Sequence, residues 1–167
     1  MLKSVFLGYD DNEKELFENT RTEIGELVYK FKYQKNKKSL NEIMNLIKEF
    51  LDKWNLREKV DFIIPVPPSN RKREYQPVFE IAKEIANYLG KECKCDLLNK
   101  VSDLQVKDGY DVQGTIKQIS KLQRLGNVLV IDDLFSTGAT LDEVCKVLKN
   151  DNNVKKVYCL VLTKTKR

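Results

Sequence analysis

The chain has 167 residues, of which 41% are hydrophobic and 33% are charged, and its formal net charge is +5. A chain of this length can bury a core without disulfides or metal staples, and no run of about 18 apolar residues predicts a transmembrane helix. We therefore expect a single globular domain with no membrane partner. Residues 1–10 contain no long apolar stretch, so we expect no secretory signal and a cytoplasmic location.

The chain contains no histidine, and its four cysteines show no Cys-x-x-Cys spacing. A zinc site is therefore not expected, and the cysteines are typical of reduced thiols in a cytoplasmic protein. The pair Cys93 and Cys95 leaves a bridge or a bound metal open. Without histidine the usual general base is missing, so the chemistry must come from carboxylates, cations and backbone amides.

The first elements in chain order are a short strand at 4–7 and a helix at 23–31 with apolar residues on one face. A second helix follows, for which Ser39 with Glu42 predicts an N-terminal cap. Its apolar stripe extends to Phe50 and Trp54, and we expect both aromatic side chains in the core.

Strands and helices alternate in the rest of the chain. Apolar runs predict strands near 61–66, 92–98, 127–132 and 154–162, and helical periodicity predicts helices over 77–89 and 139–149. This alternation predicts an α/β fold with a central, mostly parallel twisted sheet of about five strands flanked by helices. The polar stretch 99–126 has weak periodicity, and a long irregular segment of this kind is often a mobile loop over a site.

A strand-like run at 128–131 ends at two adjacent carboxylates, Asp132 and Asp133, and a turn of small and hydroxyl residues follows at 136–140. Strands of a parallel sheet end at the edge where ligands bind, which places both acids at the mouth of a site. The first N–H groups of the next helix have no partner within the helix, so the turn suits a phosphate. Thr140 with Glu143 predicts a capping box there. An ordinary helix cap is the alternative interpretation, but capping does not need two adjacent acids.

The segment 130–140, Val-Ile-Asp-Asp-Leu-Phe-Ser-Thr-Gly-Ala-Thr, closely resembles the 5-phosphoribosyl-1-pyrophosphate (PRPP) motif of the type I phosphoribosyltransferases. The resemblance implies that Asp132 and Asp133 are catalytic residues that contact the ribose hydroxyls. It also implies Mg²⁺ as cofactor, held mainly through ligand and water, with both acids as candidate metal ligands. The residues implied for the 5-phosphate are Ser136, Thr137, Gly138, Ala139 and Thr140. The Gly-x-x-x-x-Gly-Lys-Ser/Thr loop of nucleotide hydrolases is absent from the sequence.

A second apolar run, 60–66, leads into a Pro-rich turn, a basic cluster and a helix that begins near Pro77. This order resembles the ComF group of competence-associated phosphoribosyltransferase-like proteins. In type I enzymes the corresponding loop grips the pyrophosphate, and arginine suits that role because its planar fork donates two hydrogen bonds to a phosphate. A solvated basic turn is the alternative. The candidate pyrophosphate-binding residues are Pro68, Ser69, Asn70, Arg71 and Arg73.

Other parts of the chain resemble the ComF group less closely. The segment 25–33 is similar to its Leu-Lys-Tyr segment, but the sequence starts without the Cys-rich zinc ribbon that is common in that group. In the 99–126 segment Asp108 stands where the family pattern has an arginine, which leaves Lys107 or Lys100 as the substitute for it, with Lys107 as the candidate catalytic residue. The resemblance implies a type I phosphoribosyltransferase fold in a single domain, with a hood and first helices at 1–58 and a PRPP-binding core at 59–167.

The resemblance implies an enzyme that binds PRPP with magnesium and transfers the phosphoribosyl group to or from a small nucleobase-like acceptor. The alternative is a non-catalytic protein on the same fold that binds PRPP or a nucleotide, or that serves DNA uptake as a competence accessory protein. Asp108 favours that alternative. Lysines at 30–38 interleave with aromatic residues, so single-stranded DNA is left open as a partner beside a merely solvated basic surface. A homodimer is also left open, because dimers are common among relatives.

Overall fold

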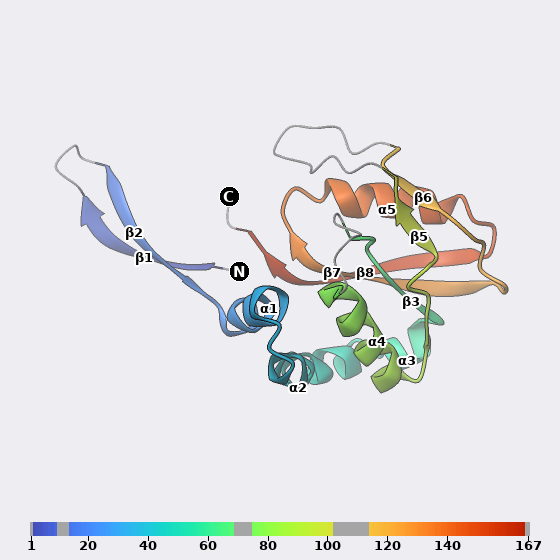
Figure 1. Ribbon diagram of the computed structural model, residues 1–167, viewed down its shortest axis with the longest axis horizontal. Helices are drawn as coiled ribbons and strands as arrows, with labels where there is room; N and C mark the ends of the chain where they lie inside the picture. Colours follow the sequence, from blue (N-terminus) through green and yellow to red (C-terminus); the bar gives the residue numbers. More distant parts are fainter. Residues whose placement is uncertain (1, 10–13, 69–74, 102–113, 166–167) are drawn as a thin grey trace.

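The computed structural model describes residues 2–9, 14–68, 75–101 and 114–165. A four-stranded parallel sheet in the order β4-β3-β7-β8 forms its centre (Figure 1). All three neighbouring pairs in this sheet run parallel, as the alternation of strands and helices predicts. The strands are β3 (Phe62–Pro65), β4 (Glu92–Cys93), β7 (Gly126–Phe135) and β8 (Val154–Lys164).

The strand expected over 92–98 is divided in two, so the central sheet has four described strands and not about five. Only β4 joins the central sheet, because the chain turns after Lys94. The next strand, β5 (Leu98–Lys100), pairs antiparallel with β6 (Ile116–Gln118) in a sheet of their own. The turn therefore carries β5 away from the parallel sheet and places Lys100 on a separate element.

Helices cover both faces of the central sheet (Figure 1). Four of them lie on one face, and α5 lies on the other together with β5 and β6. Two of the helices, α4 and α5, have the bounds that the periodicity predicts. The helices are α1 (Glu23–Gln34), α2 (Lys38–Lys53), α3 (Leu56–Lys59), α4 (Pro77–Leu89) and α5 (Ala139–Lys149).

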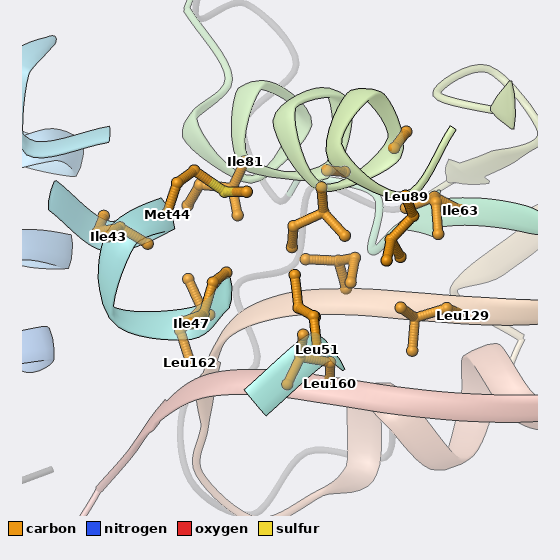
Figure 2. Close-up of a cluster of buried hydrophobic side chains, with 14 of the residues drawn as sticks. Ile43, Met44, Ile47, Leu51, Ile63, Ile81, Leu89, Leu129, Leu160 and Leu162 are labelled. Carbon is orange, nitrogen blue, oxygen red and sulfur yellow. The ribbon is translucent and has the colours of Figure 1, made fainter. Parts of the chain in front are cut away.

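Side chains of β3 and β7 alternate between two buried faces, because successive residues of a strand point to opposite sides. Phe62, Ile64, Val128 and Val130 pack with α5, whereas Ile63, Leu129 and Ile131 pack with the helices on the other face. Figure 2 shows the cluster that contains Ile63 and Leu129, in which α2 and α4 meet the sheet. The prediction that the strand before the two acids is covered on both faces is confirmed.

The outer side of α2 differs from expectation. This helix buries Ile43, Ile47 and Leu51, while Phe50 and Trp54 are 37% and 46% exposed with their ring centroids 4.7 Å apart. The prediction that both aromatic side chains lie in the core is wrong, because they fall outside the buried face of the helix. Ser39 lies within α2, whose N-cap is Lys37 without a side-chain hydrogen bond, so the predicted Ser39 cap is wrong as well.

The N-terminal strand is longer than expected and belongs to a hairpin. Strand β1 (Leu2–Tyr9) pairs antiparallel with β2 (Glu15–Arg21), and these two strands form a sheet of their own. The hairpin extends away from the central sheet, and β2 leads directly into α1 (Figure 1). None of the helices in the described ranges is long and apolar enough to cross a membrane.

Candidate functional site

The two adjacent acids lie near the C-terminal end of β7, beside the end of β3. Pro65 of β3 pairs with Ile131, and Asp132 pairs with Val161 of β8. The alternation along β7 directs Asp132 to the α5 side of the sheet, with Val128 and Val130, and Asp133 to the side of α1. The acid pair therefore straddles the sheet edge, so a ligand there can meet carboxylates from both faces.

Asp133 is held by groups from two other elements. Lys32 of α1 places its Nζ 2.5 Å from Oδ2 of Asp133, and the side chains are 28% and 12% exposed. The backbone oxygen of Asp133 accepts a 2.6 Å hydrogen bond from Oγ1 of Thr163 on β8. A half-buried ion pair thus joins α1 to the strand that carries the acids.

Our sequence reasoning missed Lys32, although a signal was present. It follows Ile24 and Val28 at intervals of four residues, on the apolar stripe of α1. A lysine at such a position needs a partner, because an unpaired charge in a buried place is costly. The sequence alone could not show that the partner would be Asp133.

The surroundings of Asp132 disfavour its charged form and raise its pKa. Burial, followed by the negative charge of Asp133, raises the pKa of Asp132 to about 6. The backbone N–H groups of Asp133 and Leu134 and the cation of Lys32 act in the opposite direction, and the first of them donates to Oδ1 over 2.8 Å. The group is therefore mostly ionised at neutral pH and can accept a hydrogen bond from a ligand hydroxyl.

Both acids line a cavity of about 390 Å³, here called the acid cavity. Lys100 of β5 also lines it, and burial lowers the pKa of that ammonium group. The cavity therefore brings two carboxylates and two lysines to the strand ends. Its lining residues are Lys32, Tyr33, Val66, Pro67, Pro68, Gln76, Pro77, Val78, Lys100, Asp132, Asp133, Leu134 and Thr140.

The turn between β7 and α5 is built around Gly138. This residue has φ of 90°, and a Cβ added there would lie 3.0 Å from Cζ of the Phe135 ring. Glycine is thus needed both for the left-handed backbone and for the close approach of the ring. The backbone N–H of Ala139 donates to Oγ1 of Thr137 over 3.2 Å. The turn is compact, and it leaves the first turn of α5 at the edge of the sheet where the two acids lie.

Of the predicted phosphate-binding residues, Thr140 lines the acid cavity. The other four, Ser136, Thr137, Gly138 and Ala139, form the adjoining turn and helix start and are not among its lining residues. The predicted capping box is wrong, because α5 has no side-chain cap and Glu143 accepts a 2.6 Å hydrogen bond from the backbone N–H of Gly114 instead. Glu143 is buried, and it anchors the chain just before β6.

Of the predicted pyrophosphate-binding residues, Pro68 lines the acid cavity at the end of β3. The other candidates from the two loops lie outside the described residues, and their roles stay predictions. They are Ser69, Asn70, Arg71 and Arg73, together with the predicted catalytic Lys107.

A second cavity of about 400 Å³ adjoins the first, and we call it the tyrosine cavity. Both cavities are lined by Lys32, Tyr33, Asp133 and Leu134, so the Lys32–Asp133 ion pair lies in their common wall. The walls of the tyrosine cavity come from the end of β2, from α1 and from the ends of β7 and β8. The other lining residues are Arg21, Gly25, Val28, Tyr29, Thr163, Lys164 and Thr165.

The carboxylate oxygens of the acid cavity suit a hard cation that takes its other ligands from water and substrate. No group of three or more His, Cys, Asp or Glu side chains that could hold a metal ion occurs among the described residues. Two carboxylates alone do not complete a coordination sphere, but Mg²⁺ keeps waters and takes oxygen ligands from phosphates. Asp132 and Asp133 fit that manner of binding.

Comparison of the sequence with protein families matches residues 32–167 to the phosphoribosyl transferase domain. No curated protein matches the chain in sequence. A crystal structure of adenine phosphoribosyltransferase is similar with a TM-score of 0.57 at 13% identity, over 98% of this chain and 85% of that one. The enzyme from Saccharomyces cerevisiae, complexed with adenine and an imino-altritol bisphosphate, gives 0.56 at 14% identity, over 98% and 83%. Orotate phosphoribosyltransferase from Aeropyrum pernix gives 0.53 at 14% identity, over 95% and 75%. At these identities the likeness establishes the fold, and it confirms the expected fold class.

Proposed function

Because the chain belongs to the family of phosphoribosyl transferase domains, we propose that it binds PRPP with Mg²⁺ and transfers the phosphoribosyl group to or from a nucleobase-like acceptor. The observation that carries this proposal is the acid cavity, in which Asp132, Asp133, Lys100 and Thr140 converge at the strand ends. Carboxylates suit sugar hydroxyls, and lysines suit phosphates, so the cavity matches the mixed chemistry of PRPP. A relation to the ComF group in particular stays a prediction.

In this proposal the acid pair binds the ribose. Oδ2 of Asp133 accepts from Lys32, so Oδ1 remains to accept a ribose hydroxyl. The carboxylate of Asp132 accepts from the backbone N–H groups of Asp133 and Leu134, and its remaining lone pairs can accept the other hydroxyl. Because Thr163 and Lys32 fix Asp133 from two sides, the carboxylate needs little reorganisation when the sugar binds.

The phosphates lie on either side of the ribose. The 5-phosphate binds at the 136–140 turn, where the first N–H groups of α5 have no partner within the helix and the helix dipole favours an anion. The pyrophosphate lies toward Pro68 and Lys100, on the side of β3 and β5. Lys100 lines the acid cavity on that side, and its ammonium group can donate to phosphate oxygens.

Catalysis follows from positioning and electrostatics, because the described site contains no histidine and the chain has none. Displacement at the anomeric carbon builds positive charge on the ribose ring, which the carboxylates of Asp132 and Asp133 stabilise. When bound, Mg²⁺ would neutralise charge on the pyrophosphate leaving group. The acceptor approaches from the tyrosine cavity, since that cavity meets the acid cavity at the Lys32–Asp133 pair.

Calorimetry with PRPP, with and without Mg²⁺, tests the proposal. We expect binding that strengthens with Mg²⁺, and a loss of about 100-fold or more in the double variant Asp132→Asn with Asp133→Asn. Two charge-assisted hydrogen bonds contribute roughly 1.5–3 kcal/mol each. Loss of both therefore corresponds to a decrease in affinity of at least about 100-fold. The matched control is Asp96→Asn, which removes an exposed carboxylate that lines neither cavity.

Equal binding by wild type and the double variant would refute the proposed site, as would no binding at millimolar PRPP. Release of pyrophosphate in the presence of a panel of nucleobases then separates transfer from binding alone. Binding without release would favour the non-catalytic alternative on the same fold. Salt-dependent binding of single-stranded DNA would be the corresponding evidence for a DNA-uptake role.

A further inference from the structure

The charged groups of the tyrosine cavity are mostly cations. Its lining residues include Arg21, Lys32 and Lys164, and Asp133 is the only carboxylate among the lining residues that the structure describes. Three cations and one carboxylate leave an excess of two positive charges around a space whose walls are otherwise largely aromatic and aliphatic. An anionic ligand would find positive charge on more than one wall.

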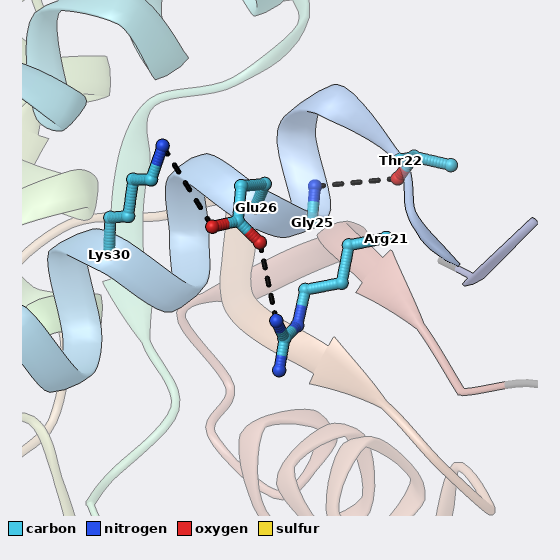
Figure 3. Close-up of polar contacts among 5 residues, drawn as sticks. All are labelled: Arg21, Thr22, Gly25, Glu26 and Lys30. Carbon is cyan, nitrogen blue, oxygen red and sulfur yellow. Dashed lines mark hydrogen bonds and ion pairs between the residues drawn. The ribbon is translucent and has the colours of Figure 1, made fainter. Parts of the chain in front are cut away.

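Arg21 is held over an aromatic wall of the cavity. Its Cζ lies 3.9 Å from the centroid of the Tyr29 ring, and its Nη1 lies 3.3 Å from Oε2 of Glu26. Figure 3 shows that the same carboxylate also meets Lys30, at 3.8 Å. One negative charge is thus shared by two cations, so the guanidinium keeps positive charge and hydrogen-bond donors for a ligand.

Lys164 approaches the cavity from the end of β8. Its Nζ lies 5.6 Å from the centroid of the Phe135 ring, and it has no ion pair with any residue in the described part of the chain. Lys32 differs, because Asp133 already balances its charge. The two cations that are least compensated, Arg21 and Lys164, therefore lie on two different walls of the cavity, one from β2 and one from β8.

We propose that the tyrosine cavity selects an anionic acceptor, namely a planar heteroaromatic ring that carries a carboxylate. The ring packs against Tyr29, Val28 and Leu134, and the carboxylate is bound by Arg21 and Lys164. Arginine suits this role because its fork donates two parallel hydrogen bonds to a carboxylate. This inference rests on the proposed function, because it names the class of acceptor for that transfer.

Pairs of probes that differ only in charge test the inference. Nicotinate is compared with nicotinamide, and 6-carboxyuracil with uracil, by calorimetry on the full chain, with and without PRPP and Mg²⁺. We expect the carboxylate of each pair to bind about tenfold or more tighter than its neutral partner. Binding is the readout, so the result does not depend on turnover.

Three variants assign the effect to residues. Arg21→Gln and Lys164→Gln should each reduce the preference for the carboxylate several-fold, while affinity for the neutral probe changes little. Lys53→Gln is the matched control, since Lys53 is an exposed cation of α2 that lines neither cavity. It should keep the full preference. Circular dichroism on each variant verifies that the fold is intact.

Equal affinity for the two members of both pairs, or tighter binding of the neutral members, would overturn the inference and leave PRPP binding untouched. A preference that survives in both Arg21→Gln and Lys164→Gln would also overturn it. Failure of PRPP to bind in the same titrations is a separate result, because it refutes the proposed transfer whichever acceptor the cavity prefers.

Discussion

Asp132 and Asp133 are neighbours in the sequence with different surroundings, because a strand directs them to opposite faces. Asp133 has a cation partner in Lys32, whereas Asp132 is half-buried on the α5 side with backbone N–H groups as its main compensation. The raised pKa of Asp132 shows that the fold maintains this carboxylate at a cost. Binding groups are often destabilising in this way until a ligand is present.

The first prediction at this scale concerns stability and pH. The pKa of Asp132 is higher in the folded protein, about 6, than its ordinary value of 3.8. Between about pH 4 and 6 the native state holds a proton that the unfolded chain has released, so this contribution to stability decreases as pH rises through that window. Asp132→Asn keeps an acceptor for the N–H of Asp133 and should stabilise the protein at pH 7, by up to about 3 kcal/mol.

Urea unfolding at pH 4 and pH 7 measures this difference. The variant and the wild type should differ little at pH 4, where Asp132 is protonated in the native state, and most at pH 7. A variant that is less stable than the wild type at pH 7 would contradict the prediction.

The second prediction concerns the Lys32–Asp133 ion pair. Lys32→Met leaves a mostly buried carboxylate without its cation, and we expect a loss of about 1–3 kcal/mol in the free energy of unfolding, less than for a fully buried pair because Lys32 is partly exposed. Lys32→Arg should restore part of it. Lys30→Met removes a more exposed pair with Glu26 and should cost about 1 kcal/mol or less. Equal losses in Lys32→Met and Lys30→Met, measured by urea unfolding, would argue against this role.

At the residue scale the sequence predicts the acids well and their partners poorly. Asp132 and Asp133 follow a strand in a contiguous motif, so their place at the sheet edge could be foreseen. Lys32 lies 101 positions from Asp133, and only the packing of α1 against the sheet brings them together. Glu143 shows the same limit, because its spacing from Thr140 suggested a cap while tertiary structure gave it Gly114.

At the scale of single elements, the turn before α5 is the most constrained. Gly138→Ala should cost about 1–2 kcal/mol, because alanine is strained at φ of 90° and its Cβ would press on the Phe135 ring. We also expect weaker binding of phosphate-containing ligands, since the turn must shift. Gly90→Ala is the control: Gly90 ends α4 with φ of 67°, and its added Cβ meets only Nη1 of Arg57, at 3.6 Å.

Gly90→Ala should thus lose stability, but not PRPP binding. Thermal unfolding and calorimetry on both variants test this contrast. Full PRPP affinity in Gly138→Ala would mean that the turn does not hold the phosphate.

Element prediction succeeded where one periodic face is buried and failed where a helix has two apolar faces. The bounds of α4 and α5 were foreseen because their stripes are single and their ends carry Pro77 and Gly138. In α2 the pattern continued to Phe50 and Trp54, but a helix of this diameter can bury only one side against the sheet. Hydrophobicity alone could not show which side that would be.

For the whole molecule, the structure separates a layered body from the β1–β2 hairpin. The two hydrophobic clusters lie on the two faces of the central sheet, and the hairpin extends away from that sheet (Figure 1). Strand pairing within the hairpin is also independent of the central sheet. From this arrangement we expect the central sheet and its helices to pack without the hairpin.

We accordingly predict that a chain lacking residues 1–20 still folds cooperatively, with a decrease of only a few degrees in melting temperature. Near-ultraviolet circular dichroism and thermal unfolding measure this result. Retention of PRPP binding in the truncated chain is expected as well, since the lining residues of the acid cavity all come from the body. Loss of the cooperative transition would show that the hairpin is part of the folding unit.

The alternation of side chains along β7 limits where this chain can gain or lose a residue. Insertion or deletion of one residue between Val128 and Asp132 would exchange the two faces for every later side chain of the strand. Asp132 would then turn toward Lys32, and Asp133 would turn toward α5, while Val128 or Val130 would keep its place. The fold can tolerate single substitutions within this strand, but the number of residues in the strand before Asp132 must stay the same. Insertions and deletions should instead accumulate in connections that precede or follow the sheet.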